Sequence, residues 1–264
     1  MAHCFSVSRE WQGNIPDAGN ERQGKHMKAI VLSSGGVDST TCIALAVAKL
    51  GREHVSTVSI YYGQKHAREL ACARKVAERY GLAHYEFDLA QIMSYSNSAL
   101  LKGSTQEIEH STYGEQSAGG KVSTDVPFRN GLMLSVAASL AAGLYEGENV
   151  ALYIGAHADD VAGAAYADCS APFMESMGNA VNIGTYGKVH VEAPFLNAGK
   201  ADVVRTGLEL HAPYELTWSC YEDGEEPCGL CATCRDRARA FAANGVEDPA
   251  LPSSAGRKED RRRG

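Results

Sequence analysis

Residues 28–39 read KAIVLSSGGVDS, a short apolar run followed by a glycine-containing loop. The run 28–33 is typical of a buried strand, and residues 40–51 (TTCIALAVAKLG) have the apolar spacing of a helix that stops at Gly51. The loop therefore lies where a strand meets a helix. That is the carboxyl end of the strand, where open α/β sheets bind their ligands.

The rest of the chain repeats this alternation of strand and helix. Strand patterns occur at 54–62, 83–89, 149–156 and 188–193, and helical patterns at 64–80, 129–145 and 200–211. Such alternation favours right-handed βαβ units and a parallel sheet. We therefore predict an α/β fold built on a doubly wound, parallel, five-stranded sheet. Residues 94–126 show no period, and we expect this long loop to order over bound substrate.

The loop between the first strand and the first helix has the chemistry of an anion site. Gly35 and Gly36 let backbone N–H groups approach an anion, and the helix N-terminus that follows adds partial positive charge. Ser34 and Ser39 can donate hydroxyl hydrogen bonds. Asp38 is unfavourable beside phosphate unless Mg²⁺ bridges the two or another cation meets it. The alternative is a tight turn with Asp38 or Ser39 as a helix N-cap.

Other nucleotide-binding motifs are absent from the sequence. No Gly-Lys-Ser/Thr occurs, which excludes the ordinary P-loop, and no GxGxxG occurs, which removes the dinucleotide fingerprint.

Eight cysteines are present, and four of them lie within fifteen residues, at the spacing C-x7-C-x2-C-x2-C: Cys220, Cys228, Cys231 and Cys234. Four thiolates can form a closed tetrahedral site, which suits one structural Zn²⁺ per chain. An iron–sulfur cluster is the alternative. Cys169 follows the fourth predicted strand, and either a catalytic or a structural role fits it.

Composition excludes several classes of protein. The chain has 264 residues, 44% apolar and 22% charged, which excludes a disordered chain, a collagen-like chain and a coiled coil. No stretch approaches the roughly 20 apolar residues of a membrane span. A net charge of -7 disfavours nonspecific binding of nucleic acid. Residues 1–26 lack a secretion signal, so we expect a cytoplasmic protein without membrane or nucleic-acid partners.

Composition also suggests four segments. Residues 1–26 are polar and glycine-rich and read as a flexible extension. Residues 27–212 form the predicted nucleotide-binding domain, and residues 213–246 form the predicted zinc module packed on it. Residues 247–264 carry two prolines and end in RKEDRRRG, and they read as a flexible tail.

The string SGGVDS resembles the signature of the PP-loop ATP-pyrophosphatase superfamily, whose fold is adenine-nucleotide alpha-hydrolase-like. Four further strings narrow the resemblance: TDVPFRNGLMLSVAASLA (124–141), IGAHADDVAGAAYADC (154–169), PYELTWSCY (213–221) and PCGLCATC (227–234). Together, over residues 28–245, they resemble the QueC family of 7-cyano-7-deazaguanine (preQ0) synthases. The chain departs from that family at Ala167 and Ser170, where Pro and Arg are usual, which puts a contact to an anion or carboxylate in doubt.

The resemblance implies an ATP-dependent C–N ligase of 7-deazapurine (queuosine/archaeosine-type) biosynthesis. Such an enzyme turns 7-carboxy-7-deazaguanine and ammonia into the nitrile through an acyl adenylate and an amide. It implies ATP, Mg²⁺ and Zn²⁺ as cofactors and a homodimer as the assembly. Three alternatives remain: a variant that stops at the amide, another PP-loop enzyme such as a tRNA sulfurtransferase, and a non-catalytic nucleotide-binding module with a zinc knuckle.

The resemblance also implies roles for individual residues. The catalytic set is Asp38, Ser39, Arg129 and Lys200. The ATP-binding set is Ser33, Ser34, Gly35, Gly36, Val37, Asp38, Ser39, Thr40 and Thr41. The substrate-binding set is Arg129, Asn130, His157, Asp159, Asp160 and Asp168. For the acids after the fourth strand the alternative is helix capping, for His157 a structural role, for Arg129 an ion pair at the surface, and for Lys200 the start of a helix.

Overall fold

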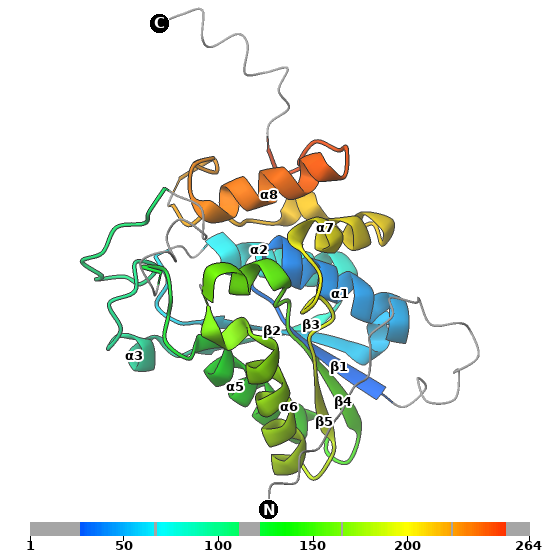
Figure 1. Cartoon of the computed structure of the whole chain (residues 1–264). Coiled ribbons are helices and arrows are strands. Elements are labelled where there is room, and N and C mark those ends of the chain that lie inside the picture. The colour runs from blue at the N-terminus through cyan, green and yellow to red at the C-terminus, as the bar shows by residue number, and fades with distance from the viewer. Residues whose placement is uncertain (1–26, 66–67, 111–121, 165, 223, 252–264) are drawn as a thin grey trace, which may run out of the picture.

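A computed structural model describes residues 27–65, 68–110, 122–164, 166–222 and 224–251 (Figure 1). Five strands form one sheet in the order β3-β2-β1-β4-β5, and every neighbouring pair is parallel. The strands are β1 (Met27–Leu32), β2 (Val55–Tyr61), β3 (Ala83–Asp88), β4 (Asn149–Tyr153) and β5 (Val189–Glu192). The predicted doubly wound, five-stranded parallel sheet is confirmed. The direction of winding reverses between β1 and β4, which is where such sheets bind ligands.

Helices cover both faces of the sheet (Figure 1). One face is covered by α5 (Arg129–Leu144) and α6 (Ala171–Gly184), and the other by α1 (Val37–Leu50), α2 (Arg68–Tyr80) and α7 (Lys200–Glu209), with α8 (Ala232–Ala243) packed on α7. Buried residues of β1 alternate between the two cores: Ile30 and Leu32 face α5 and α6, whereas Ala29 and Val31 face α1 and α7. A strand apolar on both faces is what a parallel sheet requires.

The predicted elements are found, with shifted ends. All five strands and the helices α1, α2, α5 and α7 occupy the predicted regions. The sequence did not reveal α6 and α8, nor the short helices α3 (Ala90–Met93), η2 (Arg52–His54), η3 (Ala158–Ala164), η4 (Ala167–Cys169) and η5 (Tyr214–Leu216). Of the predicted loop 94–126, the described parts 94–110 and 122–126 contain no helix or strand, and 111–121 lie outside the described residues. Its closure over substrate stays a prediction.

The C-terminal segment is anchored to the sheet domain by buried polar groups. Tyr214 is 1% exposed, and its hydroxyl lies 2.7 Å from Thr41 Oγ1 on α1. Arg237 on α8 forms a two-point ion pair with Asp248, at 2.6 and 2.8 Å. Asp248 belongs to the predicted flexible tail, so the described part of that tail, 247–251, is held by α8. The remaining tail, 252–264, and the extension 1–26 lie outside the described residues, and the division into segments stays a prediction.

Candidate functional site

A cleft opens at the carboxyl ends of β1, β2 and β4, where the winding of the sheet reverses. It encloses about 1320 Å³, measured to its open mouth. Its walls come from the glycine loop, the start of α2, the start of α5, the loop after β4, the start of α7 and residues 218–221. Segments far apart in the sequence therefore meet around one space.

The glycine loop forms the floor of this cleft. Ser39 Oγ accepts a hydrogen bond from the backbone N–H of Ser34 at 3.2 Å and donates to the carbonyl of Gly36 at 3.3 Å. The N–H of Trp218 donates to the carbonyl of Gly35 at 2.9 Å, so the C-terminal segment holds the loop from outside. Of the predicted ATP-binding residues, these line the cleft: Ser33, Ser34, Gly36, Asp38 and Ser39. The other four, Gly35, Val37, Thr40 and Thr41, lie behind it.

The two glycines of the loop, Gly35 and Gly36, have different structural roles. Gly35 has φ +77°, and a Cβ there would overlap the carbonyl oxygen of Glu69 and lie 2.7 Å from the backbone N of Ala73, both on α2. Gly36 has φ -89°, and its added Cβ would lie 3.4 Å from Ser34 Oγ, an ordinary contact. The first glycine therefore allows α2 to pack, and the second leaves room in the cleft.

We predict effects of different size for the two alanine variants. Gly35→Ala should lower the free energy of unfolding by about 3 kcal/mol, because strain at positive φ adds to overpacking against α2. That corresponds to a fall of about 10 °C in melting temperature for a chain of this size. Gly36→Ala should melt within about 3 °C of the wild type. Thermal denaturation of both checks this, and a Gly35→Ala variant as stable as the wild type would contradict the packing argument.

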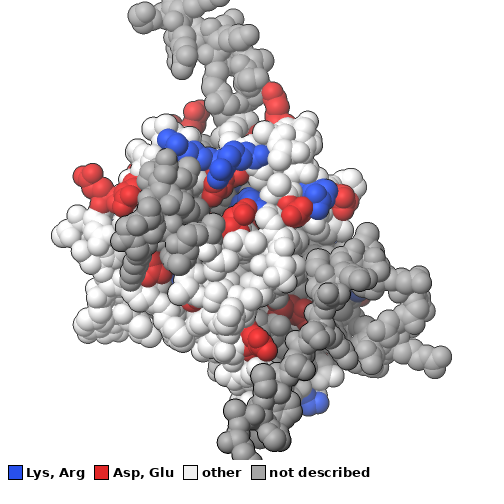
Figure 2. Space-filling model, in the orientation of Figure 1, with Lys and Arg blue, Asp and Glu red and all other residues white. Residues whose placement is uncertain are grey.

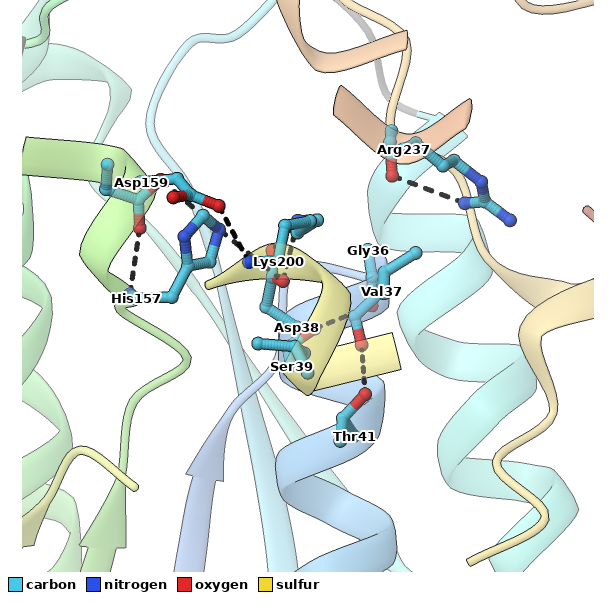
Figure 3. Close-up of polar contacts among 12 residues, drawn as sticks. Gly36, Val37, Asp38, Ser39, Thr41, His157, Asp159, Lys200 and Arg237 are labelled. Carbon is cyan, nitrogen blue, oxygen red and sulfur yellow. Dashed lines mark hydrogen bonds and ion pairs between the residues drawn. The ribbon is translucent and has the colours of Figure 1, made fainter. Parts of the chain in front are cut away.

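Asp38 and Lys200 form an ion pair inside the cleft (Figure 3). Lys200 Nζ lies 2.6 Å from Asp38 Oδ1, and His157 Nε2 lies 3.7 Å from the same oxygen. Burial alone would raise the pKa of Asp38, but the charges of Lys200 and His157 and the hydrogen bond from Lys200 hold that pKa below its ordinary value. Asp38 is therefore ionised, and a cation other than a metal meets its charge.

The loop after β4 uses its acidic residues in different ways. Asp159 Oδ2 accepts the backbone N–H of Lys200 at 2.7 Å, and so caps α7 (Figure 3). Asp168 Oδ2 accepts the backbone N–H of Asn130 at 2.8 Å, and so caps α5. Neither lines the cleft, so the capping alternative fits both. Asp160 does line it, 3.5 Å from His157 Nε2, and burial raises the pKa of its carboxyl.

Arg129 and Asn130 open α5 at the far side of the cleft, and both line it. The Arg129 guanidinium lies over the Tyr62 ring, 5.5 Å from its centre. Asn130 is buried, and its amide donates to the carbonyl of Asp168 and to Cys169 Sγ. The side chain of Asn130 is thus committed to protein partners, whereas Arg129 lines the cleft with its guanidinium over the Tyr62 ring.

Sequence reasoning missed several residues that line the cleft, among them Glu69, Trp218 and Ser219. Glu69, in the first turn of α2, lines it, and burial raises the pKa of its carboxyl to about 7. The sequence did contain one signal for Glu69. It follows the second strand, and the carboxyl ends of parallel strands lie at the same edge of a sheet. Trp218 and Ser219 also line the cleft, although LTWSCY pointed only to the zinc module. Ala167 and Ser170, the two departures from the family pattern, are not among the residues that line it.

The four predicted zinc ligands are brought together. The sulfur atoms of Cys220, Cys228, Cys231 and Cys234 all lie within 4.8 Å of one another, and those of Cys228 and Cys234 are 4.0 Å apart. Sulfurs around one tetrahedral zinc at about 2.3 Å lie about 3.8 Å apart. The cluster therefore fits a single ion, and fits less well an iron–sulfur cluster, whose several metal atoms hold their ligands further apart.

Backbone amides surround these sulfurs as they do metal-bound thiolates. The N–H groups of Glu222 and Cys228 each donate to Cys220 Sγ at 3.3 Å, and the N–H of Cys231 donates to Cys228 Sγ at 3.3 Å. Hydrogen bonds from the Cys231 and Cys234 thiols, with these amides, lower the pKa of Cys220. Such donors stabilise the charged form that binds a metal.

The surface carries mixed charge on the face shown in Figure 2. A short band of basic side chains lies over α8 with acidic side chains beside it. On α8, Arg235 and Arg239 are exposed, and Arg239 pairs with Asp236. Positive charge on this face is thus interrupted, unlike the continuous basic strip that a phosphate backbone favours. Within the described ranges, none of the helices has both the length and the apolar character needed to cross a bilayer.

Comparison with known proteins gives consistent matches. The family model described as "Queuosine biosynthesis protein QueC" matches residues 28–245. The chain is 39% identical to 7-cyano-7-deazaguanine synthase of Archaeoglobus fulgidus, over 85% of this chain and 90% of that protein. It is 41% identical to the synthase of Persephonella marina, over 83% and 94%. The solved NMN synthetase from Francisella tularensis aligns with a TM-score of 0.41 and 12% identity, over 91% and 87%. The family match runs from β1 past α8, so it includes the cleft and the cysteine cluster.

Proposed function

The chain belongs to the QueC family of queuosine biosynthesis proteins, and from this we propose that it converts 7-carboxy-7-deazaguanine and ammonia, with ATP, into 7-cyano-7-deazaguanine. The observation that carries the proposal is the cleft itself. It combines a glycine loop at a helix N-terminus, a buried lysine and a separate arginine in one space. In this proposal the substrate class comes from the name that the relatives share. The chemistry comes from the groups that line the cleft.

The proposed reaction has two activation steps. The substrate carboxylate attacks the α-phosphorus of ATP, which forms an acyl adenylate and releases pyrophosphate. Ammonia displaces AMP and gives the amide with loss of a proton. The amide oxygen then attacks a second ATP, again releasing pyrophosphate, and loss of AMP and a proton leaves the nitrile. The protein contributes mainly position and charge stabilisation.

The residues of the glycine loop hold the phosphates in this proposal. The loop amides, with Ser34 and Ser39, bind the pyrophosphate end of ATP. Lys200 serves twice, because it neutralises Asp38 and presents a buried positive charge to the phosphates. Asp38 and Asp160, which line this end of the cleft, would hold Mg²⁺, which would supply further positive charge there.

The other end of the cleft receives the deazaguanine. Arg129 is the cation for the substrate carboxylate or for the α-phosphate, and His157 and Asp160 form the wall between the two ligands. Asp159 and Asp168 act indirectly, because they fix the helix starts that carry Lys200 and Arg129. The zinc site has a structural part: it ties residues 220–234 into a rigid wall beside the glycine loop. The proposed assembly is a homodimer, as the family resemblance implies.

A sulfurtransferase reading is weaker because it needs a nucleophilic thiolate in the cleft. Cys169 is the cysteine that lines it, it is 5% exposed, and burial raises its pKa, which keeps the thiol protonated. No described feature specifically favours the non-catalytic binding module.

One reaction tests the proposal. The protein is mixed with ATP, Mg²⁺, ammonium and 7-carboxy-7-deazaguanine, and the products are followed by mass spectrometry. The expected products are the nitrile, AMP and pyrophosphate. Amide without nitrile would limit the assignment to the first activation, and would direct attention to Ala167 and Ser170. A folded, zinc-loaded protein that forms no AMP would overturn the proposal.

A further inference from the structure

Ser219 joins two parts of the molecule that the proposed function treats separately. It lies between Trp218, whose N–H holds the carbonyl of Gly35, and Cys220, a ligand of the cysteine cluster. Ser219 also lines the cleft. A Cβ added to Gly36 would lie 3.4 Å from Ser34 Oγ and 3.9 Å from Ser219 Oγ. Two hydroxyls, one from each end of the chain, therefore flank Gly36.

The hydroxyl of Ser219 accepts a hydrogen bond from a buried arginine, Arg237. Arg237, on α8 (Figure 3), is 5% exposed, and its five N–H donors all have partners. Two go to Asp248, at 2.6 and 2.8 Å, and one to the carbonyl of Tyr214, at 3.3 Å. The remaining two reach Thr217 Oγ1 at 2.8 Å and Ser219 Oγ at 3.3 Å. Arg237 has no donor left for a ligand, so any effect on the cleft passes through its partners.

Thr217 and Ser219 both accept a hydrogen bond from Arg237, but they differ in the hydrogen bonds that their own hydroxyl groups donate. Thr217 Oγ1 donates to the carbonyl of Tyr214 at 2.7 Å, so its hydrogen-bonding capacity is used inside the protein. Ser219 Oγ has Arg237 as its hydrogen-bond partner among the described residues, and a guanidinium cannot accept a proton. The hydroxyl proton of Ser219 is therefore available to the cleft, next to Gly36. A hydroxyl that accepts from a cation is also a stronger donor.

We propose that Ser219 donates a hydrogen bond to a phosphate oxygen of ATP bound at the glycine loop, with Arg237 as the residue that positions it. In this proposal the C-terminal segment has two roles. Trp218 holds the glycine loop through Gly35, and Ser219 binds a phosphate group directly. This inference rests on the proposed function, because it requires ATP at the glycine loop.

The test measures binding of MgATP to the zinc-loaded full chain by calorimetry. Ser219→Ala should weaken binding about tenfold, the loss expected for one hydrogen bond to a charged group. Its melting temperature should stay within about 2 °C of the wild type, and its zinc content should stay at one per chain. Ser219→Thr, which keeps the hydroxyl, should bind MgATP within about threefold of the wild type. Thr217→Val is the matched contrast: it should lower the melting temperature and leave MgATP affinity within about twofold.

A double-mutant cycle tests the positioning role. Arg237→Lys cannot reach Asp248 and Ser219 together, so alone it should weaken MgATP binding several-fold. When Ser219 is already alanine, Arg237→Lys should cause no further loss of MgATP affinity, because Arg237 acts on the nucleotide through Ser219. An additive loss would overturn the positioning role. If Ser219→Ala binds as tightly as a wild type that binds MgATP, this inference fails and the proposed function stands. If the wild type binds no MgATP, both fail.

Discussion

Replacing Lys200 by methionine should lower the rate of AMP formation, with 7-carboxy-7-deazaguanine and ammonium present, by about a hundredfold to a thousandfold. The ammonium group is 2.6 Å from Asp38 Oδ1 and lines the cleft. Its loss removes a positive charge from the proposed phosphate site. It also leaves the ionised carboxylate of Asp38 facing the phosphates without a counter-charge. Both changes disfavour a transition state in which negative charge builds on the leaving pyrophosphate.

Two further variants separate this loss of charge from misfolding. A partly buried carboxylate left without its partner destabilises a protein, whereas removing both partners costs much less. Asp38→Asn combined with Lys200→Met should therefore recover melting temperature but not AMP formation. Lys49→Met, on the exposed end of the same helix as Asp38, is the control and should keep full activity. A Lys200→Met enzyme that retains more than about a tenth of the wild-type rate would remove Lys200 from the catalytic set.

Replacing Cys231 by alanine should remove the bound zinc and lower the free energy of unfolding by about 5 kcal/mol or more, since metal binding and local folding are coupled. Cys231 is fully buried within the four-sulfur cluster, so no other side chain of the cluster can take its place. Metal analysis after extensive dialysis, together with thermal denaturation, measures both effects.

Cys72→Ala is the matched control for the zinc prediction. Cys72 packs against the same cluster of buried residues but is not one of its four close sulfurs. This variant should retain one zinc per chain and melt within a few degrees of the wild type. If Cys231→Ala still binds a full equivalent of zinc, the four-cysteine ligand set is wrong.

The central strands β1, β2 and β4 could be predicted because they bury both faces and are rich in apolar and β-branched residues. The edge strands β3 and β5 are more exposed. The helix α6 could not be predicted: it contains Pro172 and Gly178, and its buried side chains are Met174 and Val181. The helix α8 begins among the four clustered cysteines and carries four charged residues, so the cysteine motif concealed it. Both helices form because neighbouring elements cover them, which is information that local periodicity does not contain.

Site residues that belong to a short sequence motif could be predicted. Those whose position depends on tertiary packing were harder to predict. The glycine loop, Arg129 and the four clustered cysteines belong to recognisable strings. The structure brings the loop, Arg129 and Lys200 to one cleft and the cysteines to one cluster, while their roles stay predictions. The acids Asp159 and Asp168 were assigned to the substrate, but backbone N–H groups far along the chain take up their carboxylates. Glu69 enters the cleft because α2 packs on Gly35, a contact that only the three-dimensional structure reveals.

The hydrogen bond from Trp218 to Gly35 also bears on how the protein is made. Ribosomes deliver the glycine loop early and the segment that holds it only near the completion of translation, while domains begin to fold as they emerge. A nascent or truncated chain thus presents the loop without its clamp, its Ser219 or its zinc-bound wall. We expect such fragments to bind nucleotide poorly, so that the proposed ATP-dependent activity is acquired only with the last part of the polypeptide.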